Sequence, residues 1–190
     1  MTTQAPHDVP GGATAAGDGI ALGQGPVTVD AYIDFLCPYC REFELAAAST
    51  LNAMVAQRAV TLVYHPMSFL DGASSTRYST RAAAAAGCAA DGGRFADYAA
   101  ALFTHQPREG GPGLPDEEMI RLGLSIGLTD QDFGACVRAG RYLDWPAYVT
   151  GQASARGVAA TPTILVDGAE VDPDPRAIAE AAGVPEAGRG

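Results

Sequence analysis

The sequence contains no lysine: its 12 basic residues are all arginine and face 22 aspartate and glutamate residues. The resulting net charge of -10 is opposite to that of a surface that binds nucleic-acid phosphates, so we expect no nucleic-acid partner. Long apolar runs are also missing, since Ala82 to Ala90 is already interrupted by Gly87. A membrane-spanning helix needs about 20 apolar residues, so the sequence predicts no membrane span.

Basic residues are absent from the N-terminal region, where the first one is Arg41. Secretory signals begin with basic residues followed by an apolar segment, and neither feature is present. As written, the sequence therefore predicts a cytoplasmic protein. The alternative is an extracytoplasmic protein whose leader has been removed.

Apolar residues make up 47% of the 190 residues and charged residues only 18%, so the chain is expected to fold around a sizeable core. Glycine, alanine, threonine and proline without periodicity predict flexible tails at residues 1–18 and 183–190. Between the tails we expect an α/β core formed by residues 19–70 and 157–182. Residues 71–156 are predicted to be an all-helical insertion between the two parts of this core.

The first part of the core has the pattern of a βαβ unit. Apolar residues alternate from Val27 to Leu36, which predicts a strand, and recur at helical spacing after Cys37 up to about Arg58. Val60–Tyr64 is predicted to be a second, buried strand. Such a unit favours a parallel pair of strands with a right-handed crossover.

The rest of the chain divides into helical patterns and a closing hairpin. Expected helices in the insertion are Ser79–Ala90, Arg94–Phe103, Asp116–Ser125 and a segment that opens at Thr129. Strands Thr163–Val166 and Ala169–Val171 flank an Asp-Gly pair that favours a tight hairpin turn. Asp174 and Pro175 then predict the start of a last helix, Arg176–Ala182.

Cys37 and Cys40 form a Cys-x-x-Cys motif at the junction of the predicted strand and helix. The N-terminus of a helix lowers the pKa of a thiol and favours its thiolate, and the second cysteine lies one turn further in. At this spacing Cys40 can attack a mixed disulfide formed at Cys37 and release the substrate. The motif therefore predicts thiol–disulfide exchange.

Zinc binding is the alternative interpretation of the same pair. A tetrahedral zinc site needs two further ligands, whereas Cys88 and Cys136 are single cysteines without a neighbouring histidine. We accordingly expect no metal at Cys37 and Cys40, and no cofactor other than the redox-active disulfide that they would form.

Three segments together resemble the DsbA-like thiol–disulfide oxidoreductases of the thioredoxin superfamily: IDFLCPYCREFE, YHPMSFL and GVAATPTILVDG. The resemblance covers residues 20–182 and includes a helical insert between the second and third segments. It implies a thioredoxin-like fold in which Cys37 is the exposed nucleophile and Cys40 the buried resolving cysteine. Pro38 and Tyr39 then match the dipeptide that tunes the redox potential.

Further site residues follow from the resemblance. Thr161 and Pro162 match the cis-proline loop, which lies against the active-site sulfurs and positions the substrate backbone. Glu44 matches a buried acid and is a candidate proton acceptor for Cys40, although the lysine that pairs with it is replaced by an apolar residue, Val63. The alternative for Glu44 is a solvated glutamate on a helix face.

The charged neighbours of the motif act in opposite directions. Asp34 and Glu42 oppose thiolate formation if they face the motif, whereas Arg41 assists it.

Cys88 and Cys136 both fall on predicted helices of the insertion. They are either buried free cysteines or a structural disulfide that resembles the second disulfide of some DsbA-like proteins. A disulfide would indicate that the protein works in an oxidising compartment, against the missing signal.

The function that we expect is disulfide exchange with substrate proteins by a monomer that also meets a redox partner not identifiable from the sequence. Two alternatives remain at this point. One is an oxidoreductase or transferase for small thiols on the same scaffold, and the other is a metal-binding Cys-x-x-Cys module.

Overall fold

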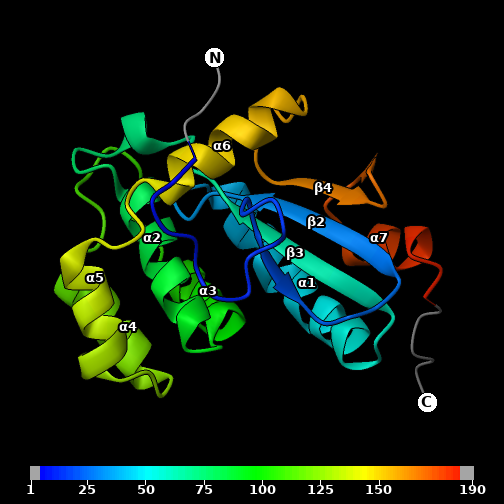
Figure 1. Ribbon diagram of the computed structural model, residues 1–190. Helices are drawn as coiled ribbons and strands as arrows, with labels where there is room; N and C mark the ends of the chain where they lie inside the picture. The colour runs from blue at the N-terminus through cyan, green and yellow to red at the C-terminus, as the bar shows by residue number, and fades with distance from the viewer. Residues whose placement is uncertain (1–4, 185–190) are drawn as a thin grey trace.

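A five-stranded sheet forms the centre of the computed structural model, which describes residues 5–184 (Figure 1). The strand order is β1-β3-β2-β4-β5. The central strands β2 and β3 are parallel, and the other neighbouring pairs are antiparallel. The strands are β1 (Ile20–Leu22), β2 (Val27–Ile33), β3 (Val60–Pro66), β4 (Thr163–Val166) and β5 (Ala169–Val171).

Helices α1 and α7 lie beside this sheet, and α2 to α6 form the insertion between β3 and β4 (Figure 1). They are α1 (Pro38–Ala56), α2 (Tyr78–Asp91), α3 (Phe95–Thr104), α4 (Asp116–Ser125), α5 (Ala135–Ala139), α6 (Trp145–Ala155) and α7 (Pro175–Ala181). A 3₁₀ turn (Asp71–Ala73) precedes α2, and a π-helical turn (Asp130–Gly134) precedes α5. In the described part of the chain, the helices are too short or too polar to cross a bilayer.

Helix α1 follows from the expected local signals. Cys37 is its N-cap and Pro38 occupies the first helical position, where proline is favoured because its fixed φ suits the helix and no amide hydrogen is needed. The buried face of α1 includes Phe43, Ala47 and Leu51, which recur at helical spacing. The predicted βαβ unit therefore places the cysteine motif where the sheet ends and α1 begins.

Strand β2 ends three residues earlier than the alternating pattern predicts. The pattern continues to Leu36, but β2 stops at Ile33. The carboxylate of Asp34 accepts a hydrogen bond from the Leu36 backbone N–H at 2.8 Å, a local turn that competes with the strand. The chain consequently turns before the cysteines.

The predicted N-terminal tail differs most from the structure. Residues 5–18 pack against the core: the Trp145 indole donates to the Gly17 carbonyl at 2.7 Å, and Asp18 is buried. The carbonyl of Asp18 also lies 2.7 Å from Nδ1 of His65. Composition suggested flexibility, but these long-range bonds satisfy the backbone of the segment and order it. Residues 1–4 and 185–190, which belong to the two predicted tails, lie outside the described part.

The end of the chain is as local turn chemistry predicts. Asp167 and Gly168, which connect β4 and β5, have φ values of 47° and 83°, as tight hairpin turns require. The Asp174 carboxylate accepts hydrogen bonds from the Arg176 and Ala177 amides and caps α7. Helix α7 packs beside α1, so both helices cover the sheet near the cysteine motif.

Candidate active site

Cys37 and Cys40 are free thiols at the N-terminus of α1. A hydrogen bond from the Cys40 thiol lowers the pKa of Cys37 to about 6, against the effect of burial. Thr161 and the backbone amides of Cys40 and Tyr39 add to this lowering. The helix N-terminus thus favours a thiolate at Cys37.

Cys40 has the opposite electrostatic environment. It is completely buried, and burial raises the pKa of its thiol far above the usual range; the hydrogen bond to Cys37 and the negative charge on Cys37 raise it further. The two cysteines therefore differ as a nucleophile and a resolving cysteine must. The resemblance implied an exposed nucleophile, but residue Cys37 is only 4% exposed.

The loop before β4 lies directly against the sulfur of Cys37. The Thr161–Pro162 peptide bond is cis, and the carbonyl oxygen of Thr161 lies 3.3 Å from Sγ of Cys37. Local propensity does not distinguish this proline from an ordinary one at the start of a strand. The contact brings together residues 124 positions apart in the chain.

Two polar side chains hold the backbone around the cysteine motif, and one of them, Gln106, was not singled out from the sequence. Gln106, just after α3, donates hydrogen bonds from Nε2 to the carbonyls of Phe35 and Cys37 at 3.0 and 2.9 Å. Arg41 donates from Nε to the carbonyl of Phe103 at 3.0 Å. Hydrogen bonds therefore connect the C-terminal end of α3 to residues before and after the cysteine motif. In the sequence, the only signal for Gln106 is that it is an amide side chain just after a predicted helix.

Glu44 is buried, so its interpretation as a solvated helix-face residue is wrong. Burial raises the pKa of its carboxyl to about 7, and a hydrogen bond from the Tyr64 hydroxyl opposes this effect. The position that faces Glu44 on β3 is Tyr64 and not Val63, because alternate residues of a strand point to opposite faces. A role of Glu44 as proton acceptor for Cys40 stays a prediction.

A groove of about 420 Å³ lies beside the cysteine motif, between α1, the loop before β4 and the start of α7. Its walls include Tyr39, a residue that is 67% exposed, together with Phe43 and Pro162. Glu42 and Asp174 also line it. The groove therefore offers a mixed apolar and acidic surface beside the cysteine motif.

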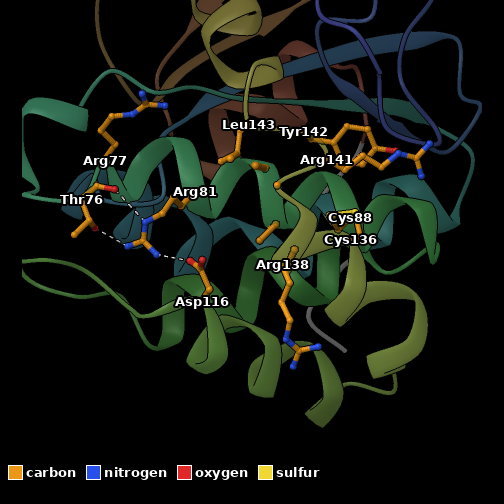
Figure 2. A pocket seen from close by; sticks show the side chains of 14 residues that line it. Thr76, Arg77, Arg81, Cys88, Asp116, Cys136, Arg138, Arg141, Tyr142 and Leu143 are labelled. Atoms are coloured by element: carbon orange, nitrogen blue, oxygen red, sulfur yellow. Dashed lines mark hydrogen bonds and ion pairs between the residues drawn. A yellow bond between two sulfur atoms is a disulfide. The ribbon is translucent and has the colours of Figure 1, made fainter.

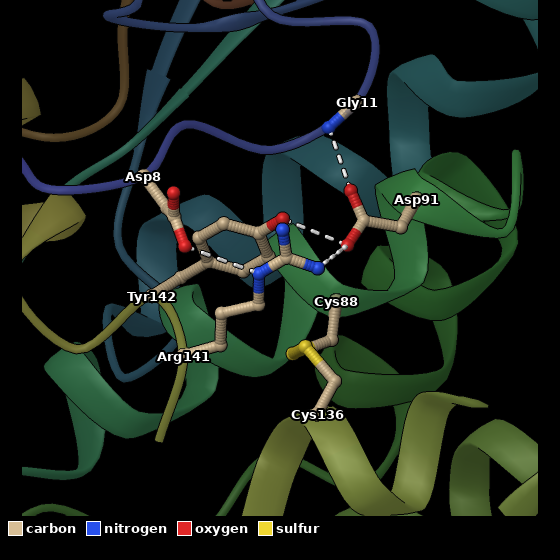
Figure 3. The surroundings of a disulfide bond; sticks show 7 residues. All are labelled: Asp8, Gly11, Cys88, Asp91, Cys136, Arg141 and Tyr142. Carbon is tan, nitrogen blue, oxygen red and sulfur yellow. Dashed lines mark hydrogen bonds and ion pairs between the residues drawn. A yellow bond between two sulfur atoms is a disulfide. The ribbon is translucent and has the colours of Figure 1, made fainter. Parts of the chain in front are cut away.

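Cys88 and Cys136 form a disulfide that joins α2 to α5 (Figure 3). Asp91, at the end of α2, accepts hydrogen bonds from the Tyr142 hydroxyl at 2.8 Å and from the Gly11 amide at 2.7 Å. The disulfide thus holds α5 at the C-terminal end of α2, and a hydrogen bond holds the N-terminal segment at the same end.

A second pocket, of about 340 Å³, lies on the insertion next to this disulfide (Figure 2). Arginine side chains line this pocket. Two of them form ion pairs: Arg81 with Asp116 at 2.6 Å, and Arg138 with Glu117 at 2.8 Å. This pairing neutralises both arginines. Among the residues described, His, Cys, Asp and Glu side chains do not gather in threes as a metal site would require.

Comparison with known proteins agrees with this geometry. The thioredoxin family model matches residues 16–181. A disulfide bond oxidoreductase, DsbG from Mycobacterium tuberculosis in its reduced form, has a TM-score of 0.75 and 36% identity, over 90% of this chain and 91% of that one. Reduced DsbA from the same organism has a TM-score of 0.71 and 34% identity, over 87% of this chain and 98% of that one.

A curated relative shares only part of its length with this chain. The serine/threonine-protein kinase PknE of Mycobacterium tuberculosis is 33% identical over 135 residues, which is 66% of this chain. The chain spans about a quarter of the length of that kinase (24%). The family-model match and the two oxidoreductase structures confirm the fold and the resemblance found in the sequence. The chain therefore belongs to the thioredoxin family, and within it to the DsbA-like thiol–disulfide oxidoreductases.

Proposed function

We propose that the chain exchanges disulfides with substrate proteins through Cys37 and Cys40. The observation that carries this proposal is the asymmetry of the pair: the pKa of Cys37 is lowered to about 6, whereas burial raises that of Cys40. A low-pKa thiol is a good attacking and leaving group near neutral pH, and a high-pKa neighbour stays protonated until it is needed.

The exchange takes two steps. A substrate thiolate attacks Sγ of Cys37 in the Cys37–Cys40 disulfide, and a mixed disulfide forms while Cys40 leaves and takes up a proton. A second thiolate of the substrate then attacks the substrate sulfur of the mixed disulfide and releases Cys37 as a thiolate. The substrate is oxidised by two electrons and the cysteine pair is reduced by two. The reverse sequence reduces a substrate.

Protein substrates are favoured over small thiols by the groove beside Cys37. Its exposed Tyr39 and the neighbouring Pro162 provide apolar surface that glutathione does not need. The loop of Thr161, with its carbonyl at the reactive sulfur, supports a role in positioning the substrate backbone.

Disulfide donation in an oxidising compartment is the direction that we propose. Stabilising the Cys37 thiolate stabilises the reduced pair and makes its disulfide a stronger oxidant. The Cys88–Cys136 disulfide points to the same setting, because such bonds rarely persist in a reducing cytosol.

The test uses two variants, Cys37→Ser and Cys40→Ser, with reduced unfolded ribonuclease and with insulin as substrates. Cys37→Ser should abolish both oxidation and reduction. Cys40→Ser should accumulate a mixed disulfide between Cys37 and the substrate protein, identified by mass spectrometry. Exchange that survives Cys37→Ser would contradict the assignment, and turnover restricted to glutathione mixed disulfides would favour the small-thiol alternative.

A further inference from the structure

Asp34 lies between the two cysteines and the helical insertion. It is the first residue after β2 and is completely buried. Its backbone N–H donates to Sγ of Cys40 at 3.4 Å, and its carbonyl accepts from the Cys37 amide at 3.0 Å. The main chain of one residue therefore contacts both members of the redox pair.

The carboxylate of Asp34 joins three segments of the chain. Oδ1 accepts from the Leu36 amide at 2.8 Å and from the Ser79 hydroxyl at 2.7 Å, and Oδ2 accepts from the Leu70 amide at 2.9 Å. Leu70 precedes α2 and Ser79 lies in its first turn, so the bonds link the insertion to the cysteine loop. All three donors are neutral, and the carboxylate is fixed without a compensating charge from them.

Charge connects this carboxylate to Cys37. Burial raises the pKa of Asp34 to about 6; the three hydrogen bonds oppose this effect, and the negative charge of Cys37 adds to it. The influence is mutual, so an ionised Asp34 disfavours the thiolate at Cys37. Two further titratable groups face Asp34: the Cys40 thiol, whose Sγ accepts from the Asp34 amide, and Tyr78 on α2, whose hydroxyl pKa is raised by burial well above the usual value for tyrosine.

We propose that Asp34 is a positioning residue that sets the redox equilibrium of the Cys37–Cys40 pair: its fixed, charged carboxylate opposes the Cys37 thiolate and shifts the pair toward the disulfide. This inference rests on the proposed function. In equilibrium with glutathione, two glutathione thiols are oxidised to one glutathione disulfide. The Cys37–Cys40 disulfide becomes a thiolate at Cys37 and a thiol at Cys40, and the remaining proton goes to Asp34 or to solvent.

The decisive variant is Asp34→Asn in the full chain. Asparagine keeps the backbone contacts and the acceptor for Leu36 and Ser79 but removes the charge. The pKa of Cys37, followed by thiolate absorbance of the reduced protein, should fall by about half to one unit. The equilibrium constant for reduction by glutathione at pH 7 should rise about 3- to 10-fold, where tenfold corresponds to about 30 mV. In the unmodified protein, titration of Asp34 should add to the pH dependence of the redox potential near pH 6. This added dependence should be absent in Asp34→Asn.

Two further variants separate this role from a structural one. Ser79→Ala removes one donor and favours the neutral carboxyl, so at pH 6.5 it should shift the equilibrium in the same direction by about twofold. Asp71→Asn is the matched control, because the Asp71 carboxylate likewise accepts hydrogen bonds at the start of α2, from the Thr80 backbone amide at 2.9 Å and from the Thr80 hydroxyl at 2.6 Å. It should leave the equilibrium unchanged.

The outcomes are distinct. An unchanged or oppositely shifted equilibrium in Asp34→Asn overturns the inference, as does an equal shift in Asp71→Asn. If Asp34→Asn does not fold, Ser79→Ala decides: a shift supports the inference and no shift overturns it. If the unmodified protein does not equilibrate with glutathione at all, the proposed function fails and the inference falls with it.

Discussion

The Tyr64 hydroxyl donates a hydrogen bond to Oε2 of Glu44 at 3.1 Å, and both side chains are buried between β3 and α1. A tyrosine can satisfy one carboxylate oxygen but brings no positive charge. The pKa of Glu44 is accordingly raised to about 7 by burial. This pair therefore gives the stability of the fold a pH dependence.

Glu44→Gln should therefore stabilise the protein at pH 8 and have little effect at pH 4.5. The folded state holds the Glu44 proton up to about pH 7, whereas the unfolded chain releases it near the usual glutamate pKa of 4.5. Stability is thus lost as the pH rises between these values, and glutamine, which keeps the acceptor for Tyr64, avoids that loss. We expect a gain on the order of 1 to 3 kcal/mol at pH 8. Urea unfolding of both proteins at the two pH values measures it; an equal effect at both would contradict the burial of a titrating carboxyl.

The alkylation of Cys37 should follow its thiolate. In the reduced protein, the rate with iodoacetamide should rise with pH and reach half its plateau near pH 6, the pKa to which Cys37 is lowered. In Cys37→Ser, the remaining Cys40 should stay unreactive at pH 7, because burial raises its pKa. Mass spectrometry assigns the labelled residue. A midpoint near about 8.5, the usual value for cysteine, would show that neither the Cys40 thiol nor the helix N-terminus lowers the pKa of Cys37.

Gln106→Ala should slow disulfide exchange without removing a cysteine. The change leaves the carbonyls of Phe35 and Cys37 without the Nε2 donor of this side chain, which costs about 1 to 3 kcal/mol of stability. Looser positioning of the motif should lower the rate of insulin reduction about 3- to 10-fold. Gln106→Glu, which places an acceptor against two acceptors, should be worse than alanine. Equal rates for all three proteins would argue against a positioning role.

Replacing both Cys88 and Cys136 by serine should destabilise the insertion and leave the chemistry intact. The disulfide closes a loop with a sequence separation of 48. Chain entropy predicts a loss of about 4 kcal/mol for such a loop, and typical disulfides contribute about 2 to 4 kcal/mol. Thermal unfolding measures this loss, and exchange with glutathione at room temperature should be retained. Loss of exchange in a folded double variant would instead place the second disulfide in the redox cycle.

Local signals determined much of the active-site half of the molecule. The alternation in β2, the proline at the start of α1 and the Asp-Gly turn after Val166 all act over a few residues, so periodicity and turn chemistry predict them. The same signals placed Cys37 and Cys40 at a strand–helix junction. The cis-proline loop and the helical insert, by contrast, were expected from the family resemblance and not from local propensity.

Contacts between distant segments decided the rest. Sequence composition indicated a flexible N-terminal segment, but Gly17 meets Trp145 across 128 positions of the chain and is held there. For Glu44, local pattern alone favoured a solvated helix-face residue and only the family resemblance implied burial, while the partner Tyr64 became known from the packed structure.

The sequence by itself determined the kind of chemistry: two cysteines at the N-terminus of a helix in a βαβ unit, where local backbone geometry favours a thiolate. Only the tertiary structure decided how that chemistry is tuned. Asp34 acts on Cys37 through its burial and through donors such as Ser79, which lies 45 positions away. Burial and long-range hydrogen bonds are properties of the packed molecule, so the electrostatics of this site arise only when the insertion closes over the sheet.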